Sequence, residues 1–372
     1  MVNEKTKVYV GMSGGVDSSL AAALLVEQGY DVTAVYMKNW TLDLPGMKCP
    51  WADDLADAKR VAVKLGIDFK VFDFQNEYKY KVVDYMIDEY KYGRTPNPDI
   101  MCNQEVKFKL FLETALSDGA DMIATGHYAR VGNGVWEMGN REEQKIPPIS
   151  QSLIPNPQLL MAIDEKKDQT YFLYRITGEA LGKTLFPIGG FTKPQVRRMA
   201  SERGLSTATK KDSQGICFIG QVGIRDFLSQ YIDVKPGEIK DSKSGKVLGR
   251  HDGAFFYTLG QRHGMELGGG LPYYVVGKDM SKNEVYVTTD LNDANLWKNS
   301  INLSDMHWIN DAPKNGEYQI RVRHQAPLVD AILTIEENGL TLKPDNPIRS
   351  ITPGQSVVIY DKDVCLGGGI VS

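Results

Sequence analysis

A glycine- and serine-rich heptapeptide near the amino terminus constrains the fold of this chain more than any other feature. The segment Ser13-Gly14-Gly15-Val16-Asp17-Ser18-Ser19 follows a β-rich run at 7–11 and joins a helical run at 18–28. Glycines at a strand–helix junction let the backbone approach a phosphate closely, and free N–H groups at a helix start favour an anion. The serine hydroxyls add donors, and an acid beside a phosphate suits a ligand to hydrated Mg²⁺. The heptapeptide therefore predicts a nucleotide-phosphate site with Asp17 as the magnesium ligand.

The first third of the chain alternates strand-like and helical runs. Strand-like runs lie at 7–11, 31–37, 69–74 and 121–125, and helical runs lie at 18–28, 53–65, 78–92 and 106–116. This alternation is typical of a Rossmann-like parallel sheet with helices on both faces. Later sequence turns glycine-rich and then strand-rich, which predicts a small β-rich central domain and a C-terminal β-barrel-like domain. We place the α/β domain at 1–218, the central domain at 219–290 and the barrel domain at 291–372.

Composition limits the classes of function. The formal net charge is −4, so nucleic acid would have to bind to a local basic surface. No apolar run approaches the ~20 residues of a membrane span, and the polar amino terminus has no signal-like core. We therefore expect a cytoplasmic protein with no membrane partner. Six basic residues lie close together in the sequence and could either contact tRNA or form a solvated helix face. They are Lys193, Arg197, Arg198, Arg203, Lys210 and Lys211.

Two further segments carry expectations about structure. In 318–323 the apolar residues alternate with Gln319, Arg321 and Arg323, which predicts a strand with one basic, exposed face. The stretch 132–164 is irregular and bears prolines, so we expect an insertion or mobile loop there. The histidines are scattered, and we assign no metal centre held by protein ligands alone.

Two of the four cysteines lie in segments that suggest chemistry. Cys102 follows the segment 94–99, whose two prolines predict a stiff, non-helical loop. Asp99 lies close before Cys102, so an acid could relay a proton while a thiol attacks. Cys217 follows a pair of lysines, and nearby cations lower the pKa of a thiol. Spacing leaves open whether these two cysteines meet; Cys49 and Cys365 are expected to be packing or loop residues.

Eight motifs, taken in order, resemble the tRNA-specific 2-thiouridylases of the PP-loop ATP pyrophosphatase superfamily. The motifs are SGGVDSS, TPNPDIMCN, ATGHYAR, KDQTYFL, LFPIGG with KPQVR, KKDSQGICFIG, YTLGQRHG and CLGGGIV. The resemblance covers nearly the whole chain. It departs from the family within 132–164, where the sequence LMAID at 160–164 replaces an Arg-Gly-x-Asp-like turn.

The resemblance implies an enzyme, a tRNA-uridine 2-sulfurtransferase. Such an enzyme adenylates the C2 oxygen of the wobble uridine (position 34) and replaces it with sulfur from a cysteine persulfide. ATP and Mg²⁺ are the implied cofactors, and tRNAs for Lys, Glu and Gln are the implied substrates. The implied sulfur donor is a cysteine desulfurase or a sulfur carrier protein.

Two other readings remain open. A PP-loop synthetase or amidotransferase acting on a small carbonyl substrate would share the phosphate loop, but it does not explain two cysteines in such segments. An RNA-binding adaptor with a vestigial nucleotide site is disfavoured by the intact loop. Release of pyrophosphate that depends on tRNA would distinguish a thiouridylase from both of them.

The resemblance also implies roles for individual residues around the nucleotide and the target base. ATP would be held by Gly11, Met12, Ser13, Gly14, Gly15, Val16, Asp17 and Ser18, with Met37 and Gly126 at the adenosine. Asn97, Pro98 and Asp99 would contact the target base, with Asp99 as the acid/base.

The resemblance assigns roles to both thiols and to a set of tRNA contacts. Cys102 matches the family's nucleophile, and Cys217 matches the persulfide carrier, which would form a transient disulfide with Cys102. The implied tRNA contacts are His127, Lys167, Asp168, Gln169, Arg323, His324 and Gln355.

Overall fold

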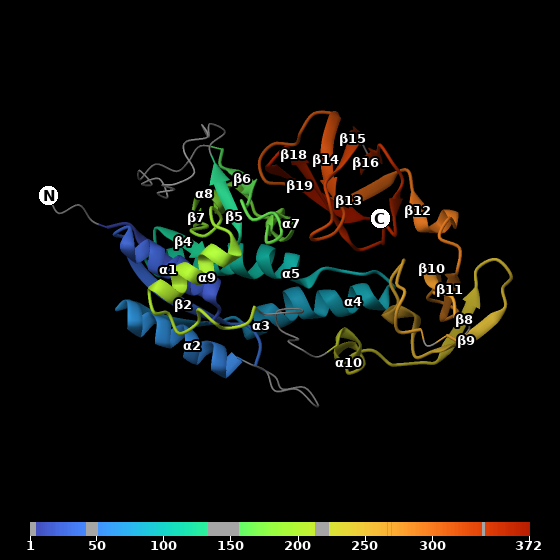
Figure 1. Ribbon diagram of the computed structural model, residues 1–372, viewed down its shortest axis with the longest axis horizontal. Coiled ribbons are helices and arrows are strands. Elements are labelled where there is room, and N and C mark those ends of the chain that lie inside the picture. The colour runs from blue at the N-terminus through green and yellow to red at the C-terminus, as the bar shows by residue number, and fades with distance from the viewer. Residues whose placement is uncertain are drawn as a thin grey trace.

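The computed structural model describes residues 5–41, 51–132, 156–212, 223–265, 267–268, 270–336 and 339–372. Cys49 and Cys217 lie outside the described residues. Figure 1 shows a parallel α/β body near the amino terminus, a barrel at the carboxyl end and a small β-rich domain beside it. Within the described part of the chain, no helix is both long and apolar enough to cross a membrane.

The α/β body is built on a five-stranded parallel sheet of order β3-β2-β1-β4-β7. Its strands are β3 (Asp68–Asp73), β2 (Asp31–Lys38), β1 (Lys7–Met12), β4 (Met122–Thr125) and β7 (Thr184–Leu185). The central strand β1 is apolar and buried on both faces, as parallel sheets require. Val8 and Val10 point to one core cluster and Tyr9 points to the other, which follows the period of two in a strand.

Helices cover both faces of this sheet. On the face of Val8 and Val10 lie α1 (Val16–Glu27), α2 (Trp51–Leu65) and α9 (Lys193–Glu202). On the face of Tyr9 lie two long helical stretches, one of α3 (Gln75–Tyr78), η1 (Lys79–Asp84) and α4 (Tyr85–Lys91), the other of α5 (Pro98–Met101), η2 (Cys102–Phe111) and α6 (Leu112–Ser117). Short helices α7 (Thr170–Leu173) and α8 (Gly178–Gly182) follow later in the chain.

The prediction of a non-helical loop at 94–99 holds for 94–97 and was wrong from Pro98 onward. Helix α5 begins at Pro98, and proline is well tolerated at a first helical position because its missing N–H would have no partner there. The side chain of Asn97 caps the helix by accepting hydrogen bonds from the backbone N–H groups of Asp99 (3.1 Å) and Ile100 (3.4 Å). Cys102 is therefore held on a helix rather than on a loop.

The central domain is a four-stranded sheet of order β10-β11-β8-β9. Its strands are β8 (Gly237–Asp241), β9 (Val247–His251), β10 (Tyr274–Asp279) and β11 (Glu284–Thr288), accompanied by α10 (Ile224–Leu228) and η3 (Ala254–Phe256). Its own small core forms around Ile239, Val275 and Val285, all fully buried.

The carboxyl-terminal strands form an antiparallel barrel, because β13 pairs with both β16 and β19. The barrel strands are β13 (Ile301–Trp308), β14 (Gly316–Arg321), β15 (Val329–Glu336), β16 (Gly339–Pro344), β18 (Ser356–Asp361) and β19 (Val364–Val371). A short ladder of β12 (Trp297–Lys298) and β17 (Ile348–Arg349) lies next to η4 (Ala294–Leu296). Cys365 is buried on β19, and burial raises the pKa of its thiol.

Strands from the α/β part of the chain extend the barrel sheet. Strands β5 (Ala129–Gly132) and β6 (Gln158–Met161) form a hairpin pair, and β6 also pairs with β19. The expectation of irregular structure throughout 132–164 was therefore wrong at β6, because a partner strand more than two hundred residues away supplies its hydrogen bonds.

The expected fold class is confirmed: a parallel α/β domain, a small β-rich domain and an antiparallel barrel follow one another along the chain. The domain boundaries at residues 218 and 290 remain predictions.

A buried ion pair fastens the barrel to the α/β domain. The Arg321 Nη1 on β14 donates to Asp168 Oδ2 at 2.7 Å, with the two side chains 7% and 0% exposed. Asp168 also accepts from the backbone N of Ala162 (3.0 Å) and from the hydroxyl of Thr170 (2.7 Å). The predicted exposure of Arg321 was wrong, because the barrel face that carries it packs against the segment of Asp168.

We predict that Asp168→Ala destabilises the protein by about 3–5 kcal/mol, because it leaves the Arg321 charge buried and unpaired. Calorimetric unfolding measures the loss. The matched control is Lys243→Ala, which breaks an exposed ion pair with Asp290 and should leave the unfolding temperature unchanged. Equal effects of the two variants would contradict the interface role of Asp168.

Candidate active site

The phosphate loop lies between β1 and α1 and is closed by its own hydroxyls. Gly14 has a φ of +71°, and a Cβ there would lie 2.4 Å from the backbone oxygen of Asp54. The Ser18 hydroxyl accepts from the backbone N of Ser13 at 3.2 Å, and the Ser19 hydroxyl donates to Gly15 O at 2.7 Å. The loop therefore needs glycine at position 14, and it presents backbone N–H groups at a helix start, as an anion site requires.

The residues predicted at the adenosine flank this loop. A side chain on Gly126, which follows β4, would place its Cβ 2.5 Å from the backbone N of Ser18. A Cβ on Gly11 would lie 2.9 Å from the methyl of Met37, which is on β2. Strands β2 and β4 are the two neighbours of β1, so the loop lies where the strand order reverses, the usual ligand site of a parallel sheet.

Asp17, in the first turn of α1, is fixed from two sides. The hydroxyl of Tyr128 donates to Asp17 Oδ1 at 2.8 Å, and the Lys193 Nζ lies 2.8 Å from both carboxylate oxygens. Burial raises the pKa of Tyr128, and the Asp17 carboxylate raises it further, so the phenol stays protonated and donates. The carboxylate predicted to hold Mg²⁺ is thus balanced by an ammonium.

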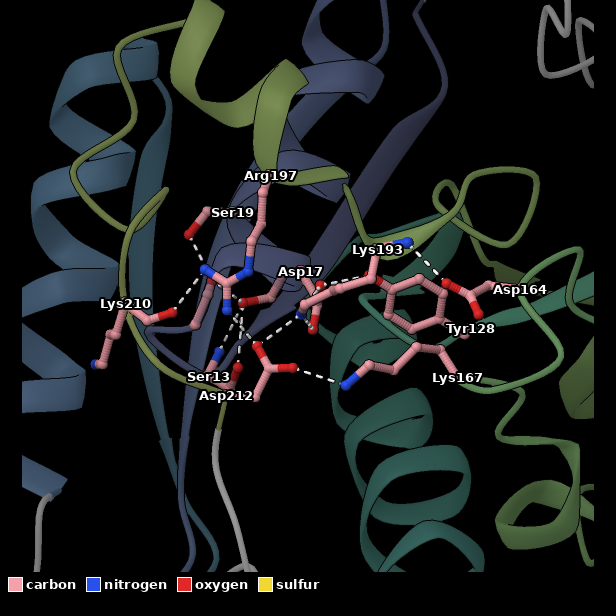
Figure 2. A network of polar contacts seen from close by, with 12 residues as sticks. Ser13, Asp17, Ser19, Tyr128, Asp164, Lys167, Lys193, Arg197, Lys210 and Asp212 are labelled. Carbon is pink, nitrogen blue, oxygen red and sulfur yellow. Dashed lines mark hydrogen bonds and ion pairs between the residues drawn. The ribbon is translucent and has the colours of Figure 1, made fainter. Parts of the chain in front are cut away.

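Asp212 gathers three cations next to this pair, as Figure 2 shows. The Lys193 Nζ lies 2.9 Å from Asp212 Oδ1, Arg197 Nη2 lies 2.6 Å from the same oxygen, and Lys167 Nζ lies 2.8 Å from Oδ2. Burial acts to raise the pKa of Asp212, but hydrogen bonds from Lys167 and Lys193 outweigh it and lower the pKa to about 2. Lys193 therefore bridges two carboxylates, one on the phosphate loop and one directly before the segment that leads to Cys217.

Another lysine ties the loop to α2. The Lys210 Nζ contacts Asp54 (2.7 Å), Asp57 (2.6 Å) and the backbone oxygen of Gly14 (3.1 Å). The basic set of the sequence therefore divides. Lys193 and Lys210 contact the phosphate loop, and Arg197 pairs with Asp212 next to it. Arg203 pairs with Glu27 and Arg198 pairs with Glu202 on the surface, where Lys211 is also exposed.

Cys102 and Asp99 share one helical stretch. Their spacing of three residues places both side chains on the same face. Cys102 is 1% exposed and begins the π-helical segment η2, a rare conformation that occurs frequently at functional sites. The structure therefore keeps Asp99 and Cys102 together; Cys217 lies outside the described residues.

The segment that begins with Lys167 connects the phosphate loop to the cysteine helix. The side-chain oxygen of Gln169 accepts from Tyr128 N at 2.8 Å, and Gln169 N donates to Tyr128 O at 2.9 Å. Three residues after Gln169, within α7, the carbonyl of Phe172 accepts from Asn103 Nδ2 at 2.9 Å. Tyr128 itself reaches Asp17, and Asn103 adjoins Cys102, so α7 spans the two halves of the site.

The predicted tRNA contacts lie in different surroundings. The ring of His127 packs against Phe108 with centroids 5.6 Å apart, and its Nδ1 shares a hydrogen bond of 2.8 Å with the Thr125 hydroxyl. Burial lowers the pKa of His127 well below its ordinary value. His324 packs on Phe172 with centroids 4.4 Å apart. Among the remaining predicted contacts, Asp168 is buried, Lys167 forms an ion pair with Asp212 and Gln169 bonds to Tyr128. Arg323 is exposed and donates to Ser350 O, and Gln355 lies in the turn before β18.

Comparisons with known proteins match nearly the whole chain. The family described as "tRNA methyl transferase HUP domain" matches residues 6–221, "tRNA methyl transferase PRC-barrel domain" matches 225–289, and "Aminomethyltransferase beta-barrel domain" matches 298–371. The tRNA-specific 2-thiouridylase MnmA of Bacillus cytotoxicus is 45% identical over 373 residues, 99% of this chain and 95% of that protein. The one of Bacillus mycoides is 44% identical with the same shares covered. The chain belongs to the tRNA-specific 2-thiouridylase family.

A more distant likeness is the solved "4-thiouridine synthetase - RNA complex with bound ATP", with a TM-score of 0.37, 17% identity, and 60% of this chain and 50% of that chain covered. The family assignment does not depend on it.

The structure shows how the segment 160–164 is placed beside the site. Leu160 and Met161 belong to strand β6, and Asp164 ends the segment. Asp164 Oδ2 accepts from the backbone N of Lys193 at 2.8 Å. Asp164 therefore supplies an acid at the start of α9, which begins at Lys193.

We predict that Gly126→Ala weakens ATP binding about tenfold or more, equivalent to at least about 1.4 kcal/mol, because the added carbon would push against Ser18 N. Isothermal titration calorimetry measures the dissociation constant. Gly182→Ala is the matched control in the same domain, since its Cβ would have an ordinary 3.7 Å contact with Pro157. Wild-type affinity in Gly126→Ala would show that the nucleotide does not use this loop.

Proposed function

We propose that this protein is an ATP-dependent tRNA-uridine 2-sulfurtransferase that acts on the wobble uridine. The observation that carries the proposal is the link through α7: Gln169 bonds to Tyr128, which bonds to Asp17, while Phe172 bonds to Asn103 beside Cys102. A phosphate loop and a cysteine helix held by one short helix suit a reaction in which one base is first activated and then attacked by sulfur.

The residues of the phosphate loop fit a nucleoside triphosphate. Gly14 and Gly126 leave room where a Cβ would collide with backbone, so the loop N–H groups stay open to a phosphate. Asp17 would hold Mg²⁺, which neutralises phosphate charge when bound. Lys193, whose ammonium lies 2.8 Å from Asp17, would supply positive charge to the bound triphosphate.

The first chemical step is adenylation of the uridine. The C2 oxygen attacks the α-phosphorus of ATP, the bond between the α and β phosphates breaks, and pyrophosphate leaves. The cations that converge on the loop, above all Lys193, stabilise the negative charge that develops on the pyrophosphate. Asp99, on the helix of the base-contacting segment, is the acid/base for the uridine.

The second step replaces the activated oxygen with sulfur. The terminal sulfur of a Cys217 persulfide attacks C2, and AMP departs with the former uridine oxygen. Cys102 then attacks the Cys217 sulfur, which leaves the transferred sulfur on the base and forms a disulfide between the two cysteines. A cellular thiol reductant restores both thiols. Release of free sulfide assisted by Cys102 is the alternative route.

The partners follow from this chemistry. The sulfur must come from a protein that carries a persulfide, either a cysteine desulfurase or a sulfur carrier, and the substrates are tRNAs for Lys, Glu and Gln. We place the reaction in the cytoplasm. Lys167, Gln169, His127, Arg323, His324 and Gln355 are the proposed tRNA contacts, while the buried Asp168 positions its two neighbours.

The proposal is tested by mixing the purified protein with ATP, magnesium, a persulfide donor and unmodified tRNA. We expect pyrophosphate release that requires tRNA, and 2-thiouridine at the wobble position by mass spectrometry. A synthetase for small carbonyl substrates, whose own substrate is absent from this mixture, would show no pyrophosphate release with tRNA, and an adaptor would also release none. Either result would refute the proposal.

We predict that Cys102→Ser and Cys217→Ser each abolish 2-thiouridine formation while tRNA-dependent pyrophosphate release persists. Neither thiol is needed to adenylate the base, but both are needed to deliver sulfur. Mass spectrometry of the tRNA and a pyrophosphate assay measure the two steps. Normal thiolation by either variant contradicts the two-thiol scheme.

We predict that Lys193→Met lowers tRNA-dependent pyrophosphate release about a hundredfold or more, because it removes a charge that stabilises the leaving group. Lys193→Arg should recover part of the rate, since the charge is kept. Thermal unfolding checks that both variants are folded. A folded Lys193→Met variant with a normal rate would remove Lys193 from the reaction.

A further inference from the structure

The chain that enters the base-contacting segment passes through a junction of all three domains. Residues 93–95 connect the end of α4 to Asn97, and they belong to the α/β domain. Gly93 has a φ of +75°, and a Cβ there would lie 2.6 Å from the side chain of Met280 in the central domain. Thr95 is the next point of contact, and both other domains touch it.

The barrel contacts Thr95 through a tight turn. The backbone N of Thr95 donates to Pro353 O at 2.9 Å. The following Gly354 has a φ of +89°, and a Cβ there would lie 2.8 Å from both Arg94 Cβ and Thr95 N. The same turn is attached to the last strand, β19, because Gly354 N donates to Val371 O at 3.0 Å. Its backbone position therefore follows the barrel.

The central domain contacts both Thr95 and the barrel through the short segment 258–260. The hydroxyl of Thr258 lies 3.2 Å from the hydroxyl of Thr95. Two residues on, Gly260 has a φ of +79°, and a Cβ there would lie 2.0 Å from Ser350 Oγ in the barrel. The central domain thus contacts both Thr95 and the barrel, so the backbone and the side chain of Thr95 are held by two different domains.

The position of Thr95 sets the position of the catalytic helix. Pro96 and Pro98 restrict the backbone between Thr95 and α5, and Asn97 caps that helix. Asp99 and Cys102 lie on this helical stretch. A displacement of Thr95 would therefore also displace the side chains of Asp99 and Cys102.

We propose that the turn of Pro353 and Gly354, together with Thr258 and Gly260, forms a positioning contact that couples the barrel and central domain to the base-contacting segment. Gln355, a proposed tRNA contact, follows Gly354 directly, so tRNA bound at the barrel acts on Thr95 through this turn. Gly354 and Thr258 touch no reacting group and act through Thr95. This inference rests on the proposed thiouridylase function.

The test compares Gly354→Ala with Gly119→Ala. Both glycines have left-handed backbones, with φ of +89° and +94°, so both substitutions carry similar backbone strain. A Cβ at Gly119 meets nothing within 4 Å, whereas one at Gly354 presses on Thr95. Single-turnover 2-thiouridine formation at saturating tRNA and ATP is measured, together with dissociation constants for both ligands and the unfolding temperature.

We expect Gly354→Ala to slow thiolation by about ten- to a hundredfold, because misplacing a catalytic segment by about 1 Å has an effect of this size. Both dissociation constants should stay within about twofold of wild type. A rate equal to that of Gly119→Ala overturns the proposal, as does a loss explained by weaker tRNA binding alone. A wild-type protein that forms no 2-thiouridine refutes the proposed function instead.

If Gly354→Ala does not fold, Thr258→Val serves in its place. It preserves side-chain shape and removes only the hydroxyl that meets Thr95. Thr341→Val is its control, since Thr341 on β16 bonds to Asn302 on the neighbouring barrel strand β13. We expect a slower thiolation rate in Thr258→Val alone, and equal rates in the two variants overturn the proposal.

Discussion

The ammonium of Lys193 lies between the carboxylates of Asp17 and Asp212, and the rest of the site is arranged around it. It is 2.8 Å from Asp17 and 2.9 Å from Asp212, and the residue is 9% exposed. Removing one member of such a partly buried set leaves charge without compensation, which is far more costly than losing an exposed pair. The bridge joins α1 to α9 and to Asp212, so the phosphate loop and the last described residue before the segment of Cys217 share one electrostatic centre.

The barrel domain helps to hold this centre in place through its contacts with the α/β domain. The barrel takes up strand β6 and buries Arg321 against Asp168, which fixes the residues on either side of Asp168. Lys167, on one side, bonds to Asp212, and Gln169, on the other, bonds to Tyr128. Domain docking and the geometry of the phosphate loop therefore depend on the same short segment.

Local patterns in the sequence predicted the parallel sheet, the phosphate loop and the barrel, because strand alternation and glycine placement are encoded within a few residues. The contacts of Lys193 could not be predicted in this way, since its partner Asp17 lies 176 positions away. Arg321 was expected on an exposed face because strand alternation does not show which face another domain covers. At Pro98 the sequence did hold the answer: Asn97 before a proline is a helix-start signal, but the two prolines were interpreted as helix breakers.

The central chemical claim is that the oxygen removed from the uridine is the atom that ATP activates. It is tested most directly with tRNA whose wobble uridine carries a heavy oxygen isotope at C2, by mass spectrometry of the AMP formed in one turnover. The account predicts that AMP gains the label as thiouridine appears. Unlabelled AMP, with the heavy isotope recovered in water, would contradict adenylation of the C2 oxygen.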